Sequence, residues 1–315
     1  MNNSLTICIT GAGGTVGRLL VEHYLRNPQV TIKAIERSEM AMAELLATFQ
    51  NNPRLEPILA DLLDAPSFQG ALTDCDVVIH CAALKHVLIG KQFPERQAYE
   101  NVTAFYNLIR AARGAKVQKF LLCSTDKAAQ PTGVMGATKH LLEFICRDAA
   151  TPTFATGAVR FANILGSNGS LLHVIQNRLK DGGDITLRDP RMTRYFLRAP
   201  EVVELIDYAL THIQNGEIFT RDTPTARIQD VIEVAFEHYG IPEHRLRMTT
   251  QQTQENTHER LISPDEVYLT RKASHYFIVR GTHGATLTQV EQERALSSST
   301  QNLSKNQIRT LLYGN

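Results

Sequence analysis

The 315-residue sequence has no excess of charge of either sign, with 33 basic and 32 acidic residues. This balance gives no electrostatic reason to expect a nucleic acid or an anionic membrane as a partner. A few local Arg and Lys side chains would still be enough to bind an anionic small molecule. No apolar run approaches the ~20 residues of a membrane span, and the N-terminus lacks the basic segment and apolar core of a signal peptide. These absences predict a cytoplasmic protein without a membrane span.

Cysteine is also scarce, and its five positions are widely spaced. The sequence has no Cys-x-x-Cys motif and no Cys/His ligand cluster, so we expect no metal site. Three of the cysteines fall in or at the end of apolar runs, where Cys usually acts as a small hydrophobic residue: Cys8, Cys81 and Cys123. A reduced, cytoplasmic protein is the simplest interpretation. The length allows a full core in one large domain or two.

The first chemical motif is a glycine-rich loop, Gly11-Ala12-Gly13-Gly14-Thr15-Val16-Gly17. A short β-rich run precedes it, and apolar residues at helical spacing follow it. In this context the glycines let the backbone approach a pyrophosphate, and the helix N-terminus supplies free N–H groups. The sequence therefore predicts a dinucleotide contact made by Gly11, Gly13, Gly14, Thr15 and Val16.

A second strand, expected over residues 30–35, ends at Glu36, Arg37 and Ser38. An acid about 20 residues past the loop is placed to accept hydrogen bonds from an adenosine ribose, which favours NAD. Arg37 could instead receive the 2′-phosphate of NADP, or it could be a solvated loop charge. We expect all three residues to contact the cofactor, with NAD favoured and NADP open.

Two further strands are expected over residues 55–60 and 76–80, and polar or small residues follow each of them. Asp61 and Leu62 are placed to meet an adenine, and Ala82 and Ala83 are small enough to let a nicotinamide ribose lie close. Strands alternating with helices indicate an α/β fold with a doubly wound parallel sheet of Rossmann type. In such sheets the ligand lies beyond the carboxyl ends of the strands, where all of these segments fall.

The densest group of proton-exchanging side chains follows a fifth apolar strand. Ser124, Thr125, Asp126 and Lys127 come directly after it, and a turn leads to a helix that carries Met135 and Lys139. Hydroxyls, an acid and two amines at the end of a buried strand indicate an active-site segment.

The pattern loosens past residue 150, where Gly-, Asn- and Arg-rich loops separate shorter elements. We expect a dinucleotide-binding domain over residues 1–165. Residues 166–315 are expected to form mainly a smaller substrate-binding lobe, with some segments returning to the core. The segment Ser304-Lys305-Asn306-Gln307 is a capping box that predicts a last helix. The polar stretch 285–302 is expected to be a surface excursion.

The sequence resembles the extended short-chain dehydrogenase/reductases, and within them the UDP-N-acetylglucosamine 4,6-dehydratases that act on bacterial surface sugars. The resemblance covers nearly the whole chain. Besides the glycine loop, it is carried by Ala82-Ala83-Leu84-Lys85-His86-Val87, Ser124-Thr125-Asp126-Lys127-Ala128, Gly136-Ala137-Thr138-Lys139 and Met192-Thr193-Arg194-Tyr195. The glycine loop belongs to the whole superfamily, whereas the Ala-Ala-Leu-Lys-His-Val, Ser-Thr-Asp-Lys-Ala and Met-Thr-Arg runs together are specific to the dehydratases.

One position departs from the superfamily pattern. Its catalytic pair is Tyr-x-x-x-Lys, and here Met135 occupies the Tyr position before Lys139. A thioether has no proton to exchange. The sequence also resembles a branch of the same dehydratases, mostly larger membrane-anchored enzymes, that carries Met here and is active. This favours retention of configuration at C5. An inverting dehydratase and an inactive nucleotide-sugar or dinucleotide sensor are the alternatives.

The resemblance implies that C4 of UDP-N-acetylglucosamine is oxidised by hydride transfer to bound NAD(P)⁺, that water leaves from C5–C6, and that the hydride returns to C6. Asp126 is then the acid for the 6-hydroxyl and Lys127 the base for C5. Each would need a pKa moved toward neutrality by burial and by its neighbour. With Tyr absent, the 4-hydroxyl proton leaves through Thr125 or Asp126. A 4-epimerase is a second enzymatic interpretation, but epimerisation at C4 does not need the acid Asp126 and the base Lys127 at C6 and C5.

Lys139 is expected to bind the nicotinamide ribose and completes a catalytic set with Thr125, Asp126, Lys127 and Met135. Further cofactor contacts are expected from Lys85, Asn101 and Ser124. Contacts to UDP-N-acetylglucosamine are expected from Lys85, His86, Thr125, Asn163, Ser170, Met192 and Arg194. The family resemblance also suggests a homo-oligomer.

Overall fold

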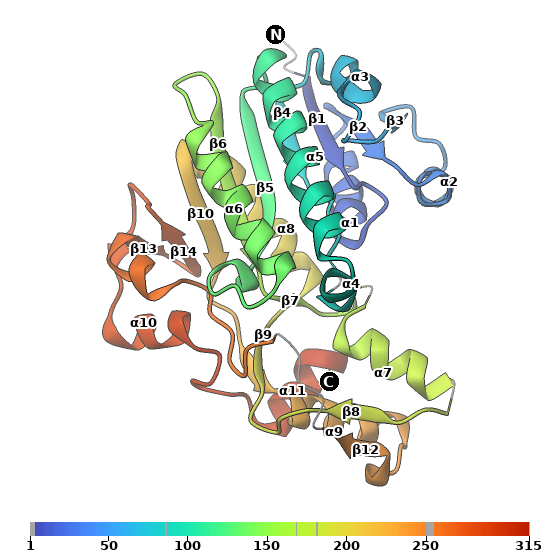
Figure 1. The fold of residues 1–315 in the computed structure, drawn as a ribbon, viewed down its shortest axis with the longest axis vertical. Coiled ribbons are helices and arrows are strands. Elements are labelled where there is room, and N and C mark those ends of the chain that lie inside the picture. Colours follow the sequence, from blue (N-terminus) through green and yellow to red (C-terminus); the bar gives the residue numbers. More distant parts are fainter. Residues whose placement is uncertain (1–3, 86, 168, 181, 250–254, 315) are drawn as a thin grey trace. The chain divides into compact units, whose positions relative to one another are not determined.

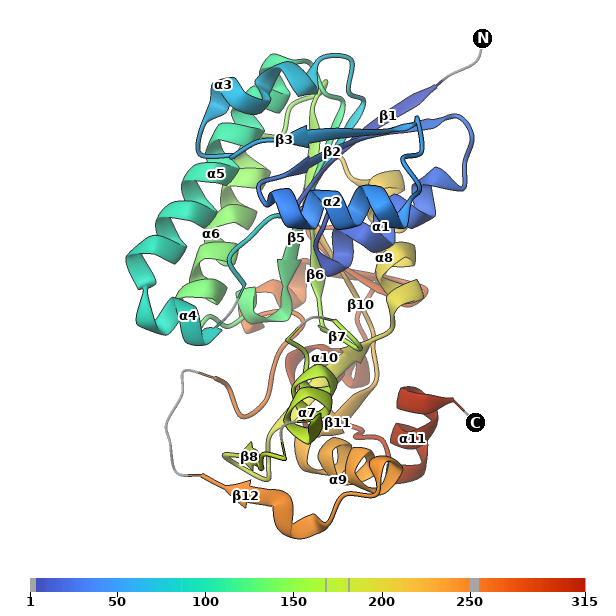
Figure 2. The same cartoon turned by 90° about the vertical axis from the view of Figure 1, so that its right-hand side faces the viewer.

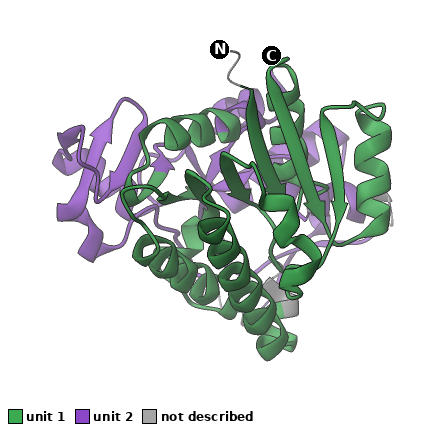
Figure 3. Ribbon diagram, turned by 90° about the horizontal axis from the view of Figure 1, so that it is seen from above, with its two compact units in different colours: residues 1–160, 202–219 green, residues 161–201, 220–315 purple. Residues whose placement is uncertain are grey.

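The structure is a computed structural model that describes residues 4–85, 87–167, 169–180, 182–249 and 255–314. His86, one of the expected substrate contacts, lies outside the described residues. The chain divides into two compact units (Figure 3). Unit 1 comprises Met1–Arg160 and Val202–Phe219, and unit 2 comprises Phe161–Glu201 and Thr220–Asn315. The functional division expected at residue 165 stays a prediction.

Unit 1 alternates strands and helices. In chain order they are β1 (Leu5–Thr10), α1 (Thr15–Leu25), β2 (Val30–Glu36), α2 (Glu39–Thr48), β3 (Leu55–Leu59), α3 (Ala65–Phe68), β4 (Val77–His80), α4 (Val87–Gln92), α5 (Pro94–Gly114), β5 (Lys119–Thr125), α6 (Val134–Asp148) and β6 (Ala155–Phe161), followed by most of α8 (Ala199–His212) and β10 (Asn215–Arg221).

The strands of unit 1 lie in the order β10-β6-β5-β4-β1-β2-β3. β1 pairs in parallel with both β2 and β4, and the β2–β3 and β4–β5 pairs are also parallel. The order therefore runs outward from β1 in both directions, which is the doubly wound arrangement. The predicted α/β fold with a Rossmann-type, mostly parallel sheet is confirmed.

Helices cover both faces of this sheet, as its strands require. All four residues of β4 are buried, because a parallel strand covered on both faces has no solvent side. Figure 2 shows α5 and α6 on one face and α1 and α8 on the other. α5 and α6 lie side by side (Figure 1). The buried face of α6 includes two charged residues, Lys139 and Glu143, among apolar ones.

Unit 2 has shorter elements. In chain order they are β7 (Asn163–Ile164), α7 (Leu171–Lys180), β8 (Ile185–Leu187), β9 (Thr193–Leu197), β11 (Thr225–Arg227), α9 (Ile228–Tyr239), β12 (Leu246–Met248), β13 (Thr270–Ala273), β14 (Tyr276–Val279), β15 (Ala285–Thr286), α10 (Gln289–Leu296) and α11 (Lys305–Tyr313). The capping box at Ser304 opens α11, as predicted. Among the helices that the structure describes, none is long and apolar enough to cross a bilayer.

The polar stretch 285–302 is mostly exposed or half-buried, as expected of a surface segment, but it is not irregular and three of its residues are buried. This stretch contains α10, which starts with a capping box in which the Thr288 hydroxyl and the Glu291 carboxylate satisfy each other's backbone N–H groups. Ala295 and Ser298 are fully buried. Ser298 tolerates burial because its hydroxyl is hydrogen-bonded to the Thr193 backbone and side chain in β9 and to the Glu259 N–H.

Candidate functional site

The glycine loop after β1 is packed against the end of β4. Gly11 has φ +64°, and a Cβ atom there would lie 2.8 Å from the Ala82 backbone. At Gly17, a Cβ would lie 2.3 Å from the Gly11 carbonyl oxygen, so only glycine fits. α1 begins at Thr15, followed by Val16. Its N-cap residue is Gly14, which makes no side-chain hydrogen bond to the first N–H groups of the helix. The first N–H groups of α1 therefore suit the phosphates of a dinucleotide.

The loop after β2 fixes a carboxylate beside these glycines. Glu36 Oε2 accepts a hydrogen bond of 3.1 Å from Gly13 N–H, and Oε1 accepts from Arg37 and Ser38 N–H at 2.9 and 3.3 Å. The Ser38 hydroxyl caps α2 by accepting from Ala41 N–H. Oriented in this way, the Glu36 carboxylate can accept hydrogen bonds from ribose hydroxyls. The glycine loop and this acid together fit an adenine dinucleotide.

Asp61 and Leu62 follow β3, next in the sheet. Asp61 Oδ1 accepts from Leu63 N–H at 2.9 Å, and its other oxygen lies 3.9 Å from the Arg37 guanidinium. Leu62 is buried. Asp61 is thus held at the carboxyl end of β3, beside the end of β2, where the sequence predicted an adenine contact.

The loop after β4 is anchored by Asn101 of α5. Its side chain accepts a hydrogen bond from Leu84 N–H at 2.8 Å and donates to Leu84 O and to the Thr138 hydroxyl, both at 3.2 Å. Ala83 and Lys85 are exposed in this loop. Asn101 therefore shapes the segment that carries Ala82, Ala83 and Lys85; whether it also touches a cofactor stays a prediction.

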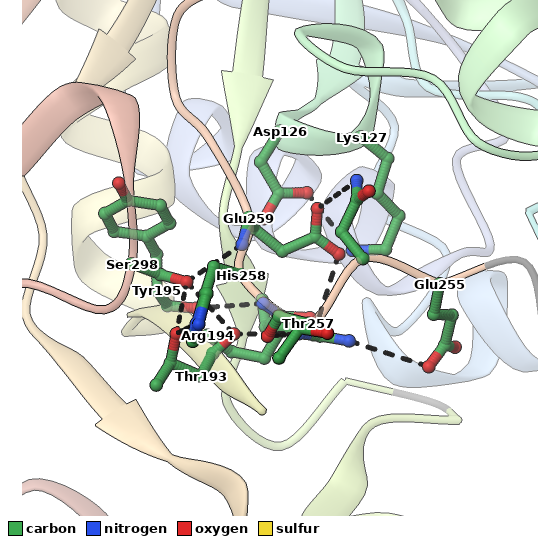
Figure 4. A network of polar contacts seen from close by, with 12 residues as sticks. Asp126, Lys127, Thr193, Arg194, Tyr195, Glu255, Thr257, His258, Glu259 and Ser298 are labelled. Atoms are coloured by element: carbon green, nitrogen blue, oxygen red, sulfur yellow. Dashed lines mark hydrogen bonds and ion pairs between the residues drawn. The ribbon is translucent and has the colours of Figure 1, made fainter. Parts of the chain in front are cut away.

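The structure brings Thr125, Asp126 and Lys127 into direct contact at the end of β5. The Thr125 hydroxyl donates to Asp126 Oδ1 at 2.9 Å, and Lys127 Nζ donates to the same oxygen at 3.2 Å. Asp126 is 1% exposed, whereas the Lys127 side chain is 22% exposed. Figure 4 shows the two groups side by side. An acid, an amine and a hydroxyl share one proton-exchanging cluster.

α6 places Met135 and Lys139 on its buried face. Lys139 Nζ donates a hydrogen bond of 2.7 Å to the Cys123 carbonyl in β5. Burial lowers the pKa of Lys139, and the thiols of Cys123 and Cys81 and the Glu143 carboxylate oppose this shift. Met135 is 8% exposed. Lys139 thus reaches the end of β5 beside the cluster, as the spacing of the motif predicts.

A buried ion pair lies behind Ser124 and was not predicted from the sequence. The Ser124 hydroxyl donates to Glu143 Oε1 at 2.6 Å, and Arg160 donates to both Glu143 oxygens at 3.0 and 2.7 Å. All three residues are buried. Glu143 comes four residues after Lys139, on the same helix face; that spacing was the available signal. The pair joins α6 and β6 to the end of β5.

In unit 2, the predicted substrate residues lie on or next to β7, α7 and β9. Asn163 Nδ2 donates to Tyr195 O at 2.9 Å, and the Ser170 hydroxyl accepts from His173 N–H at the start of α7. Met192 is buried directly before β9. Substrate binding by these residues stays a prediction.

Arg194 in β9 is 5% exposed and surrounded by acceptors (Figure 4). It donates to Thr193 O at 2.8 Å and to Thr257 O at 3.3 Å, and its guanidinium lies 3.6 Å from both Glu255 and Glu259. The two carboxylates, which sequence reasoning missed, compensate the buried charge. Whether Arg194 also contacts a substrate stays a prediction.

No group of three His, Cys, Asp or Glu side chains within the described ranges could hold a metal ion.

Comparison with known proteins identifies the family of the chain. The family model described as polysaccharide biosynthesis protein matches residues 7–281. The uncharacterized membrane protein MJ1061 of Methanocaldococcus jannaschii is 35% identical over 284 residues, 87% of this chain and 85% of that one.

Two solved structures show the same fold over most of the chain. Pen from Bacillus thuringiensis has a TM-score of 0.90 at 25% identity, covering 98% of this chain and 96% of its own. UDP-glucuronic acid 4-epimerase from Bacillus cereus, in complex with UDP-glucuronic acid and NAD, has a TM-score of 0.74 at 19% identity, with 98% of both chains covered. The second likeness concerns the fold alone. From the family model and the sequence relative, the chain belongs to the polysaccharide biosynthesis protein family.

Proposed function

We propose that the chain is an NAD-dependent 4,6-dehydratase of UDP-N-acetylglucosamine that makes a UDP-4-keto-6-deoxy-N-acetylhexosamine for surface glycan synthesis. The observation that carries this proposal is the Thr125–Asp126–Lys127 cluster at the carboxyl end of β5. Its support comes from the resemblance of the Ser-Thr-Asp-Lys-Ala run to the dehydratases and from the family assignment. NAD is supported by the anchored Glu36 carboxylate and by the NAD bound to the epimerase of the same fold.

The reaction removes one molecule of water and leaves the sugar's overall oxidation state otherwise unchanged. A dinucleotide held by the glycine loop and Glu36 would supply the hydride acceptor for C4 and the hydride donor for C6. Asp126 takes the 4-hydroxyl proton, directly or through the Thr125 hydroxyl that donates to it, and the Thr125 hydroxyl then holds the resulting keto oxygen. Lys127, as the neutral amine, then removes the C5 proton, which the keto group makes acidic, while Asp126 passes the proton taken from the 4-hydroxyl to the leaving 6-hydroxyl. When the hydride reaches C6, Lys127 returns a proton to C5. Lys139 holds the nicotinamide ribose.

Met135 is the residue that favours retention of configuration at C5. A thioether at the position of the superfamily's Tyr cannot act as acid or base, so proton transfers fall to the cluster after β5. The resemblance to the Met-containing dehydratase branch supports retention. An inverting dehydratase would keep the same cluster. It would differ in the face of the sugar from which the proton returns to C5.

The purified protein, supplied with UDP-N-acetylglucosamine and either NAD or NADP, tests this function. We expect the 4-keto-6-deoxy product by NMR, with solvent deuterium at C5 when the reaction runs in D₂O. A 4-epimerase would give a 4-epimer without deuterium at C5, because its chemistry does not touch that carbon. Absence of turnover with both dinucleotides would contradict the dehydratase and favour a sensor that only binds.

Replacing Gly17 by alanine (Gly17→Ala) is expected to weaken NAD binding by an order of magnitude or more. The new Cβ would lie 2.3 Å from Gly11 O, so the loop that cradles the pyrophosphate must move. The matched control is Gly70→Ala, where no atom lies within 4 Å of the new Cβ. Calorimetric titration with NAD measures both. Equal affinities in the two variants would show that this loop does not hold the dinucleotide.

A further inference from the structure

Glu100 is an acidic residue on the buried side of α5 that no step of the proposed reaction uses. It is 9% exposed. Its carboxylate accepts a hydrogen bond of 2.9 Å from Arg37, in the loop after β2, and pairs on its other oxygen with Arg96, one turn earlier in α5. The Arg37 and Arg96 side chains are 50% and 63% exposed. One nearly buried carboxylate therefore holds two arginines that would otherwise extend into water.

The position of Arg37 gives this contact a consequence for ligand binding. Arg37 directly follows Glu36, whose carboxylate is anchored on the glycine loop, where an adenosine ribose would lie. NADP differs from NAD by a phosphate on that ribose, which carries about −1.5 to −2 charges at neutral pH. A guanidinium beside the ribose is the natural partner of that phosphate. Here Nη1 of that guanidinium already donates to Glu100, which fixes the direction of the Arg37 side chain.

The charges at this corner of unit 1 oppose a further anion. Glu36, Asp61 and Glu100 supply three carboxylates, and Arg37 and Arg96 supply two guanidinium groups, which leaves one negative charge in excess. Asp61 lies 3.9 Å from Arg37 and compensates it further. An entering 2′-phosphate would have to pull Arg37 away from Glu100 and leave that nearly buried carboxylate less well paired.

We infer that Glu100 is a specificity-determining residue that favours NAD over NADP by holding Arg37, in the dinucleotide-dependent enzyme proposed above and resting on that proposal. The Glu36 carboxylate accepts hydrogen bonds from the ribose hydroxyls, which favours NAD. Glu100 keeps the Arg37 guanidinium away from the position where the 2′-phosphate of NADP would bind it. Sequence position alone gave no reason to connect them, since 63 residues separate Glu100 from Arg37.

The variant Glu100→Gln keeps the shape of the side chain and removes its charge. Calorimetric titration of the full-length protein with NAD and with NADP should show NADP binding about tenfold tighter than in the wild type, the effect of freeing one charge-assisted contact. NAD affinity should stay within about twofold. The matched control, Glu95→Gln, removes one charge from an exposed position of the same helix and should change neither affinity.

The double variant Arg37→Ala/Glu100→Gln should lose the gain in NADP affinity, because the gain acts through Arg37. A gain that persists without Arg37, or no gain in a folded Glu100→Gln protein that binds NAD, would overturn the role of Glu100 and leave the proposed function standing. A wild-type protein that binds neither dinucleotide would contradict both.

A second variant keeps the inference testable if Glu100→Gln does not fold. In the wild-type background, Arg37→Gln should leave NADP affinity unchanged, since Glu100 already holds the Arg37 side chain through Nη1. A roughly tenfold loss of NADP affinity in Arg37→Gln would mean that Arg37 is available to the phosphate, and Glu100 would then have no role in the choice.

Discussion

Asp126→Asn is expected to lower kcat for UDP-N-acetylglucosamine dehydration by about 10²–10⁴-fold, the usual contribution of a general acid. The amide fills the same space in the cluster with Thr125 and Lys127 but cannot protonate the leaving 6-hydroxyl. Substrate binding should change much less, because the loss falls on the transition state. Steady-state kinetics with NMR detection of the 4-keto-6-deoxy product measures both effects.

Lys127→Ala should lower kcat by a similar factor through a different step. Without the amine, the C5 proton has no base, so solvent deuterium should no longer enter C5 at the wild-type rate. The matched control for Asp126→Asn is Asp148→Asn, which removes an exposed carboxylate at the end of α6 and should leave kcat unchanged.

An Asp126→Asn enzyme that keeps more than a tenth of the wild-type kcat would place the acid elsewhere.

The residues of this cluster could be predicted from the sequence because their placement depends on local order. Parallel strands end at one edge of a sheet, so short polar segments after apolar runs meet there. Glu36 at the end of β2 and Asp126 directly after β5 follow this rule, and both side chains are anchored at those ends.

The buried charges could not be predicted in the same way. Arg160 lies in an apolar strand and pairs with Glu143 in the preceding helix, whereas Glu100 lies on a helix and pairs with Arg37, 63 residues away. Apolar periodicity indicates which positions are buried when they are hydrophobic, but a charged residue at such a position is interpreted as solvated. Its burial depends on tertiary pairing that one sequence does not display.

The helix and the buried residues within the polar stretch 285–302 were not predicted, for a related reason. Its composition is typical of a surface segment, and the capping box formed by Thr288 and Glu291 was overlooked although the pattern Thr-x-x-Glu is visible. Ser298 is buried only because β9 and Glu259 supply its hydrogen-bond partners. The capping-box pattern is therefore a local signal for the start of α10, whereas the burial of Ser298 follows only from the tertiary fold.

Arg160→Met is expected to destabilise unit 1 by about 3–5 kcal/mol, the usual cost of removing one partner of a buried ion pair. It leaves the buried Glu143 carboxylate with Ser124 but without its cation. The double variant Glu143→Leu/Arg160→Met should recover most of this loss, since a buried pair replaced by apolar side chains often costs little. The Ser124 hydroxyl then lacks its acceptor, which leaves a residual penalty of about 1–3 kcal/mol.

Urea unfolding followed by circular dichroism measures these differences, together with hydrogen exchange of β5 and β6 amides, because the two units of the chain need not unfold together. The control is Arg26→Met, which breaks an exposed pair with Glu22 in α1 and should change the unfolding midpoint little. If Arg160→Met unfolds at the wild-type urea concentration, the pair does not support unit 1. If it alone is destabilised and the double variant recovers, the cost lies in the unpaired carboxylate behind Ser124, and the end of β5 is held in place by charge as well as by packing.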